Sequence, residues 1–194
     1  MAHAKGKALE LTAEDRTDLA NIQDYLNRIK TLRSRFLQAS SNGSYAEGTL
    51  YLSRPGNMRI EYDPPVKMLI VADGTWLIYH DLELDQVTHV PLQITPASII
   101  VDEKLSLFSE SLDILKIERA PGVISVTLAR KDDEEGTITL VFGAKPLVLK
   151  KWLVVDAQGI KTSVSLLSSR FGVPVDPKLF VVKAKPRHQQ RDNN

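Results

Sequence analysis

Four histidines are the side chains in this sequence best suited to bind a metal or move a proton near neutral pH. They are His3, His80, His89 and His188, and none of them has metal-ligand spacing. No cysteine is present to complete a zinc site or to act as a nucleophile. His80 and His89 fall in predicted strands and could face each other across a hairpin, but solvent-facing histidines explain them better. The histidines predict neither a metal site nor a catalytic centre.

Two acidic runs are the other candidates for chemistry, because clustered carboxylates can bind calcium or act as acids and bases. One comprises Asp81, Glu83 and Asp85, and the other spans Asp132 to Glu135. Both are more typical of solvated hairpin tips. The sequence also lacks a P-loop and the patterns G-x-G-x-x-G, G-x-S-x-G and H-E-x-x-H. We therefore expect no enzyme activity, no metal and no cofactor.

The composition is that of an ordinary globular chain. Of 194 residues, 43% are hydrophobic and 25% are charged, which argues against disorder. The 25 basic and 24 acidic side chains leave a formal charge of +1, whereas nucleic-acid-binding domains are usually basic. No apolar run approaches the roughly 18 residues of a membrane-spanning helix. The lack of cysteine excludes disulfides and a lipid anchor on an N-terminal cysteine.

The two ends of the chain differ from its middle. We expect one domain over residues 1–182 and a polar, basic, disordered tail over 183–194. The tail either contacts anionic lipid headgroups or only aids solubility. Met1 to Leu11 lacks the apolar core of a signal peptide. Ala2-His3-Ala4 has the small-x-small form of a secretory cleavage site, so we expect a signal that has been removed, although a chance tripeptide explains the pattern as well.

One amphipathic helix is predicted near the N-terminus. Thr12 and Asp15 have the spacing of a capping pair at a helix start. Apolar residues then recur at steps of three and four, which places them on one helical face: Leu19, Ile22, Leu26 and Ile29. A helix with such a stripe lies on an apolar surface.

After Lys30 the apolar period is two, which indicates strands separated by turn formers such as Asn42-Gly43 and Asp73-Gly74. Their short connections favour an antiparallel meander. We predict about eleven strands, at Leu32–Ala39, Ala46–Ser53, Met58–Tyr62, Val66–Ala72, Trp76–Asp81, Gln86–Val90, Leu112–Glu118, Val123–Arg130, Thr137–Phe142, Leu147–Val155 and Ile160–Ser168.

The alternation fails between Pro91 and Ser111, where two short helices are predicted. Thr95-Pro96 offers an N-cap and a proline at the first helical position, before the apolar residues Ala97 to Val101. A second apolar cluster follows at Leu105, Leu107 and Phe108.

Alternating polarity gives the sheet one apolar face, as Met58, Ile60 and Tyr62 against Arg59 and Glu61 illustrate. A twisted sheet of this length tends to curl toward a barrel with its apolar face inward. Side chains, helices or a ligand must then fill the interior. Alternation alone leaves open whether the sheet packs dry on its helices or encloses a cavity.

The segment Gly48–Tyr62, which reads GTLYLSRPGNMRIEY, carries a family resemblance. It is followed in order by Pro65, Val71-Ala72-Asp73-Gly74, Trp76 with Tyr79, Gln86-Val87-Thr88 and Thr95-Pro96. Together these motifs resemble the periplasmic outer-membrane lipoprotein carrier family (LolA-like). The resemblance covers at least Leu19–Val101 and, more loosely, the remaining strands. It implies a mainly β fold with an α lid, a half-open antiparallel β-barrel capped by the N-terminal helix and the short mid-chain helices.

The resemblance also implies a function. Such carriers hold the acyl chains of lipoproteins in an apolar cavity, receive them from an ATP-driven inner-membrane transporter and pass them to an outer-membrane acceptor. Arg54, directly before Pro55, matches the family arginine that bonds backbone carbonyls of the lid and holds the empty cavity shut. Met58 and Ile60 stand where the best-known members have large aromatic residues, so the preferred cargo is not predicted.

Candidate site residues follow from the alternation and the resemblance. The sheet side of the lipid cavity is predicted at Leu50, Leu52, Met58, Ile60, Met68, Ile70, Trp76, Ile78, Val126, Leu128, Ile138 and Leu140. The lid side is predicted at Leu19, Ile22, Leu26, Ile99, Ile100, Leu105 and Phe108, with Arg54 as the latch.

We therefore expect a monomeric periplasmic carrier of acylated lipoproteins that contacts membranes only transiently. The alternative is an envelope lipid-binding or sensing module with the same fold and a different ligand or protein partner. A dry structural domain is the third interpretation.

Overall fold

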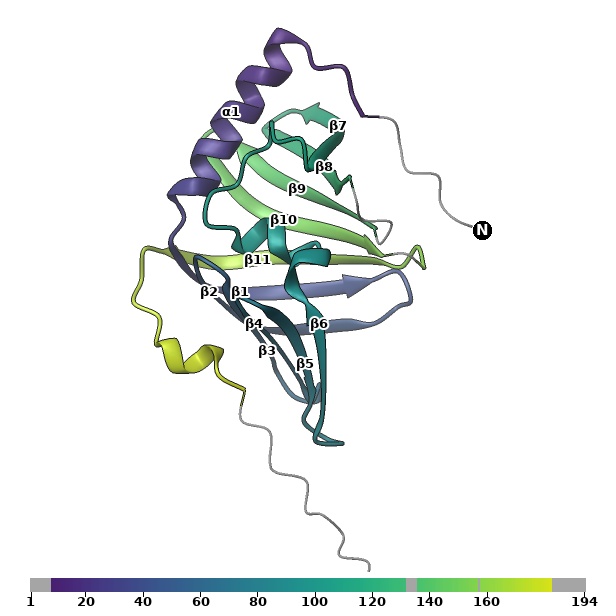
Figure 1. Cartoon of the computed structure of the whole chain (residues 1–194), viewed down its shortest axis with the longest axis vertical. Coiled ribbons are helices and arrows are strands. Elements are labelled where there is room, and N and C mark those ends of the chain that lie inside the picture. The colour runs from purple at the N-terminus through teal and green to yellow at the C-terminus, as the bar shows by residue number, and fades with distance from the viewer. Residues whose placement is uncertain (1–7, 132–135, 157, 183–194) are drawn as a thin grey trace, which may run out of the picture.

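One antiparallel sheet of eleven strands organises the chain (Figure 1). The structure is a computed structural model that describes residues 8–131, 136–156 and 158–182. The strands are β1 (Thr31–Ser40), β2 (Tyr45–Ser53), β3 (Asn57–Tyr62), β4 (Met68–Asp73), β5 (Trp76–Asp81), β6 (Gln86–Pro91), β7 (Leu112–Ala120), β8 (Val123–Arg130), β9 (Gly136–Ala144), β10 (Leu147–Asp156) and β11 (Lys161–Phe171). The helices are α1 (Ala13–Arg28), η1 (Leu92–Ile94), α2 (Ala97–Val101) and η2 (Pro177–Phe180).

All eleven predicted strands are confirmed, each with ends within a few residues of the prediction. The sheet order is β6-β5-β4-β3-β2-β1-β11-β10-β9-β8-β7, so two meanders are joined where β1 pairs with β11. The free edges, β6 and β7, are the strands on either side of the interrupted segment. The lid segment therefore crosses from one edge of the sheet to the other.

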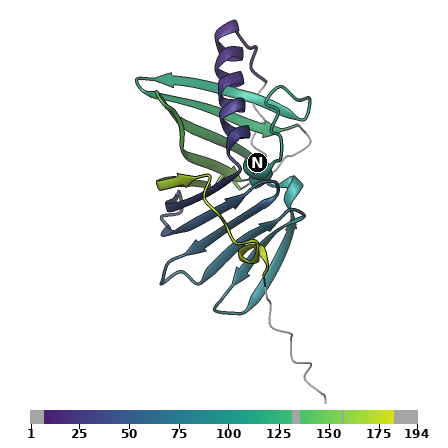
Figure 2. The same ribbon diagram turned by 90° about the vertical axis from the view of Figure 1, so that its left-hand side faces the viewer.

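The sheet is curved and open, and most of the helical structure lies on its concave side. α1 runs across the half formed by β7–β10, while η1 and α2 lie near the middle (Figures 1 and 2). η2 instead packs beside β3 and β4. The half-open barrel with a helical cover is thus confirmed, and its two halves are covered by different elements.

The predicted helix start at Thr12 is confirmed as a capping box. The Thr12 hydroxyl accepts a hydrogen bond from the Asp15 N–H, and the Asp15 carboxylate accepts one from the Thr12 N–H (2.9 Å). Arg119, from β7, donates to the same carboxylate (2.8 Å). These contacts fix the first turn of α1 to the rim of the sheet.

α1 packs on one half of the concave face through its apolar stripe. Its stripe residues Leu19, Ile22 and Leu26 are buried, and burial of each such side chain contributes about 1.5–3 kcal/mol to folding. Tyr25 packs edge-to-face on Phe142 of β9, with ring centroids 6.0 Å apart. The Tyr25 hydroxyl also accepts a hydrogen bond from the Leu149 N–H (3.0 Å). Apolar side chains therefore occupy the space between the stripe of α1 and this half of the sheet.

The interrupted segment differs in part from the prediction. α2 begins after Thr95-Pro96 as predicted, but no helix forms around Leu105 and Phe108. Asn27 of α1 instead bonds both the N–H and the carbonyl of Leu105 (2.9 Å each), and Gln23 accepts from the Leu107 N–H (2.8 Å). These amide side chains satisfy the backbone groups that a helix would otherwise have paired.

A second, smaller cluster lies on the convex face and was not predicted. Leu69, Val71 and Ile78 are buried there beneath Phe180 of η2. β4 and β5 are therefore apolar on both faces, because the chain after β11 returns across their outer side.

Asp15 gives a pH-dependent prediction. Hydrogen bonds from Thr12 are the largest cause that lowers the pKa of Asp15 from 3.8 to about 2, and Arg119 adds to the effect. A carboxyl group whose pKa is lowered by folding stabilises the fold above its unfolded pKa and loses that contribution as pH falls through the folded value. The stability difference between the wild type and Asp15→Asn should be full at pH 7 and shrink between pH 3.8 and about 2.

Urea unfolding of both proteins at several pH values measures this difference. Other carboxyl groups titrate in both proteins, so the comparison isolates Asp15. A difference that stays constant down to pH 2 would contradict the assigned role of the capping network.

Candidate functional site

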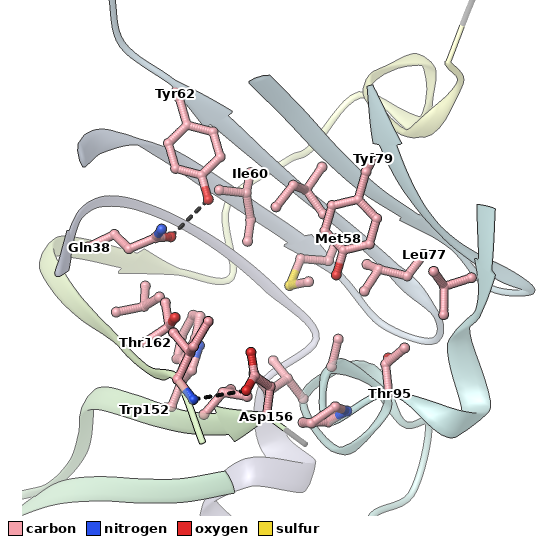
Figure 3. Close-up of a pocket in the computed structure, with 18 residues that line it drawn as sticks. Gln38, Met58, Ile60, Tyr62, Leu77, Tyr79, Thr95, Trp152, Asp156 and Thr162 are labelled. Carbon is pink, nitrogen blue, oxygen red and sulfur yellow. Dashed lines mark hydrogen bonds between the residues drawn. The ribbon is translucent and has the colours of Figure 1, made fainter. Parts of the chain in front are cut away.

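The half of the concave face that α1 leaves uncovered contains a cavity of about 450 Å³ (Figure 3). This volume lies in the ordinary range for ligand sites, roughly 300–1,000 Å³. One wall comes from β3 to β6, the opposite wall from β10 and β11, and α2 covers one side. The lining residues are Gln38, Met58, Ile60, Tyr62, Ile70, Leu77, Tyr79, Val90, Thr95, Pro96, Ala97, Ile100, Trp152, Val154, Asp156, Ile160, Thr162 and Val164.

Strand register brings the lining side chains together. Ile60 of β3 pairs with Ile70 of β4, which pairs with Tyr79 of β5. Directly paired residues in an antiparallel sheet point to the same face. Residues two positions away along each strand, such as Met58 and Leu77, therefore reach the same cavity.

The predicted sheet and lid residues fall into four groups. Met58, Ile60, Ile70 and Ile100 line the cavity itself. A second group lines a smaller void of about 20 Å³, which shares Ile100 and Trp152 with the cavity and so continues it toward Arg54. That group comprises Leu26, Leu50, Leu52, Ile99 and Leu140.

The third group lies in the buried core and not along the cavity. Its members are at most 2% exposed and comprise Leu19, Ile22, Leu105, Val126, Leu128 and Ile138. These positions do not line the cavity, because α1 packs over β7–β10. Alternation places a residue on the concave face but does not say which half the helix covers.

Four predicted residues point elsewhere. Trp76 and Ile78 lie on the convex face, since Leu77 and Tyr79 are the β5 residues that face the cavity. Met68 shares the concave face with Ile70 but lies outside the lining. Phe108 is 45% exposed, and Leu107 is buried in its place. None of these four residues is part of the cavity lining.

Several lining residues were missed by the sequence analysis. Leu77 and Tyr79 were missed because β5 is apolar on both faces. Trp152 was missed because a register shift between Leu149 and Lys151 breaks the alternation of β10, so that Leu149 and Trp152 are both buried. Gln38 was missed because its side chain is polar, whereas the cavity residues were predicted from apolar side chains.

Arg54 ties three segments together at the end of the small void. Its Nε–H donates to the Asp102 carbonyl after α2 (2.7 Å), and its Nη1 donates to the Leu26 and Ile29 carbonyls at the end of α1, at 3.4 Å for Ile29. The next turn adds a bond from the Gly56 N–H to the Val101 carbonyl (2.8 Å). Burial lowers the pKa of Arg54, but arginine remains charged at any physiological pH.

A second arginine holds α2 from the opposite half of the sheet. Arg130 of β8 donates through Nε and Nη2 to the Ser98 hydroxyl, at 3.0 and 2.7 Å. The Ser98 hydroxyl in turn donates to the Thr95 carbonyl (2.7 Å). The short α2 helix is therefore positioned by polar contacts at both its beginning and its end.

Neither a metal-binding cluster nor a membrane-spanning helix occurs among the described residues. They contain no group of three histidine, aspartate or glutamate side chains that could hold a metal ion. Within the same ranges, no helix has both the length and the apolar character needed to cross a membrane.

An open curved β-sheet with a helical cover over an apolar cavity defines the class of this protein, in which the candidate binding cavity lies on the concave face of the sheet. The family model described as outer membrane lipoprotein carrier protein LolA matches residues 27–183. The chain therefore belongs to the LolA family.

Individual relatives agree with this assignment. The chain is 30% identical over 159 residues to an outer-membrane lipoprotein carrier protein of Pseudomonas syringae, which covers 77% of this chain and 76% of the relative. It is 27% identical over 173 residues to the protein of that name in Methylococcus capsulatus, with 84% and 82% covered. Among solved structures, a DUF1329 family protein from Desulfovibrio piger is similar in fold, with a TM-score of 0.51 and 12% identity over 87% of this chain and 96% of that one.

The position of the cavity allows a prediction of how a bulky substitution in the lid changes ligand affinity. Ala97 of α2 lines the cavity, so Ala97→Trp should fill part of it. We expect binding of an apolar fluorescent dye such as N-phenyl-1-naphthylamine to weaken about tenfold, which corresponds to roughly 1.4 kcal/mol. Ala20→Trp, on the exposed side of α1, is the matched control and should bind the dye as the wild type does. Equal binding by Ala97→Trp would show that the dye does not enter this cavity.

Proposed function

We propose that this protein carries acylated lipoproteins through the periplasm, from the inner to the outer membrane, with their acyl chains in the cavity. The observation that carries the proposal is an apolar cavity covered by a short helix that is fastened by Arg54. Family membership and the names of the relatives support it.

The energetics of acyl chains explain why such a carrier needs a cavity. Each methylene group removed from water contributes about 0.8 kcal/mol, so one long chain left exposed costs on the order of 10 kcal/mol. A soluble carrier must cover that surface. It must also release the acyl chain again, so the affinity of its cavity for the chain has to be limited.

Opening of the lid is the step at which binding can be controlled. The small void of about 20 Å³ is too small for a chain, but it is bounded by Ile99 and Ile100 of α2. A shift of α2 away from the sheet would join it to the larger cavity. That shift must break the bond from Arg54 to the Asp102 carbonyl and the bond from the Gly56 N–H to the Val101 carbonyl, so Arg54 contributes to the cost of opening.

The proposal includes partners and a domain organisation. An ATP-driven inner-membrane transporter delivers the lipoprotein, an outer-membrane acceptor receives it, and the carrier works as a monomer. Residues 1–182 form the carrier domain, with a signal peptide removed before it. The basic tail at 183–194 lies outside the described residues.

Arg54→Leu tests the latch. Loss of the guanidinium removes a donor from three carbonyls, of which Leu26 keeps the bond from the Ile29 N–H (3.1 Å). We therefore expect the free energy of unfolding to fall by about 1–3 kcal/mol while the protein stays folded. Lipoprotein should load but its transfer to outer-membrane vesicles should be impaired. Arg54→Lys should be intermediate, since one ammonium group cannot match the fork of arginine.

The matched control is Arg33→Leu. Arg33 lies in the adjacent strand, but its guanidinium stacks on Tyr51 on the convex face, 5.6 Å from the ring centroid. This variant should load and transfer normally. Normal transfer by Arg54→Leu would refute the latch.

A transfer assay tests the function as a whole. Inner-membrane vesicles loaded with a radiolabelled lipoprotein should release it into solution only when the protein and ATP are both present. Release of no lipoprotein, together with binding of another envelope lipid or protein, would favour the sensing module.

A further inference from the structure

The cavity has a polar end as well as an apolar end. Gln38, Tyr62, Tyr79 and Thr162 contribute side-chain oxygen or nitrogen atoms to its lining, beside Ile60 and Ile70 (Figure 3). Arg54 and the small void lie at the other end, next to Thr31 at the start of β1. Gln38 is seven residues further along β1, which corresponds to roughly 20 Å of strand.

The Gln38–Tyr62 pair is held in place by close packing. Phe36 and Tyr62 are both opposite Gly48 in the register of β1, β2 and β3. A Cβ atom on Gly48 would lie 2.7 Å from the Phe36 ring, so glycine lets that ring lie against the strand. Phe36 in turn meets Tyr62 edge-to-face, with centroids 5.4 Å apart. Tyr62 is thereby aimed at Gln38.

The pair leaves hydrogen-bond donors free to face the cavity. The Tyr62 hydroxyl donates to Gln38 Oε1 (2.8 Å), and the Gln38 amide N–H groups bond to no described residue. If the amide is turned over, its nitrogen donates to the tyrosine oxygen and the hydroxyl hydrogen becomes the free donor. In either orientation the site presents a neutral donor.

Tyr79 of β5 adds a second neutral donor, on the wall formed by β3 to β6. Its hydroxyl forms no hydrogen bond with any residue in the described ranges, and its ring lines the cavity (Figure 3). Burial raises the pKa of Tyr79. Burial is also the largest cause that raises the pKa of Tyr62 to about 12, and the charge of Tyr79 adds to this effect. Both phenols therefore keep their proton at neutral pH.

The charge of the side chains at this end of the cavity favours neutral ligand groups over anionic ones. Asp156 is the one acidic or basic side chain among the described residues that line the cavity. Its carboxylate accepts hydrogen bonds from the N–H groups of Gln158 and Ile160 (2.9 Å each). A carboxylate in the cavity lining repels phosphate and free fatty acid, whereas it does not repel neutral carbonyl groups.

We propose that Gln38 and Tyr79 form a carbonyl-binding subsite that recognises the ester groups of a diacylglyceryl anchor and sets the direction in which its chains enter. The proposal rests on the function proposed above. The carbonyls stay at the polar end, and the hydrocarbon tails point toward Trp152, α2 and the void beside Arg54. An acyl chain spans about 15 Å, half the hydrocarbon core of a bilayer, so this direction provides enough length.

Replacing esters by ethers tests the subsite without changing chain length. The probes are two soluble peptides with an S-diacylglyceryl or an S-dialkylglyceryl cysteine, measured by dye displacement from the full chain. An ether lacks the carbonyl acceptor, and one neutral hydrogen bond contributes about two- to tenfold in affinity. The wild type should prefer the ester by that factor.

Tyr79→Phe and Gln38→Met should each reduce this preference toward one, because the ester then loses a hydrogen bond that the ether never forms. The matched control is Tyr51→Phe, which removes a hydroxyl on the convex face and should keep the preference. Thermal melting verifies that each variant is folded, and Tyr79→Phe loses no hydrogen bond to the described protein.

The possible outcomes separate the subsite from the carrier function. Equal affinity of the wild type for ester and ether overturns the subsite while leaving lipid binding intact. A preference that survives in both variants overturns the assignment to Gln38 and Tyr79. Failure of both probes to bind overturns the proposed function itself.

Discussion

The contacts of Arg54 with backbone carbonyls are the interaction on which the arrangement of the concave face depends. The last carbonyls of a helix have no partner within the helix, and α1 and α2 both end near the β2–β3 turn. One planar guanidinium reaches both ends, which fixes the two helices relative to each other and to the sheet. Because these bonds are polar and few, they position the lid without the large apolar interface that would make it permanent.

The same sheet serves two purposes because its helices are of unequal size. The sixteen residues of α1 fill the concavity over β7–β10, and their packing supplies a rigid half. The five residues of α2 are too few to fill the other half, so a hollow is left between β3 and β11. Stability and binding are thus assigned to different parts of one continuous sheet.

Local patterns in the sequence predicted what depends on local physics. Alternation and turn residues gave all eleven strands, and Thr12 with Asp15 gave the start of α1. Long-range pairing was not predictable, since nothing in β1 specifies β11 as its neighbour.

The misplaced site residues have similar physical causes. Trp76 and Ile78 were assigned to the wrong face because η2 covers the convex side of β5 and removes the alternation there. The core residues under α1, such as Val126, differ from the cavity residues only in what covers them. Lid residues Leu105 and Phe108 lie in a segment whose backbone is satisfied by Gln23 and Asn27, and propensity carries no information about such distant partners. This segment is bound to α1 at one end and continues from β6 at the other. The lid segment is therefore attached to the rest of the protein at both of its ends. Its middle can move away from the sheet by an amount that depends on the size of the ligand, but the segment as a whole cannot separate from the sheet.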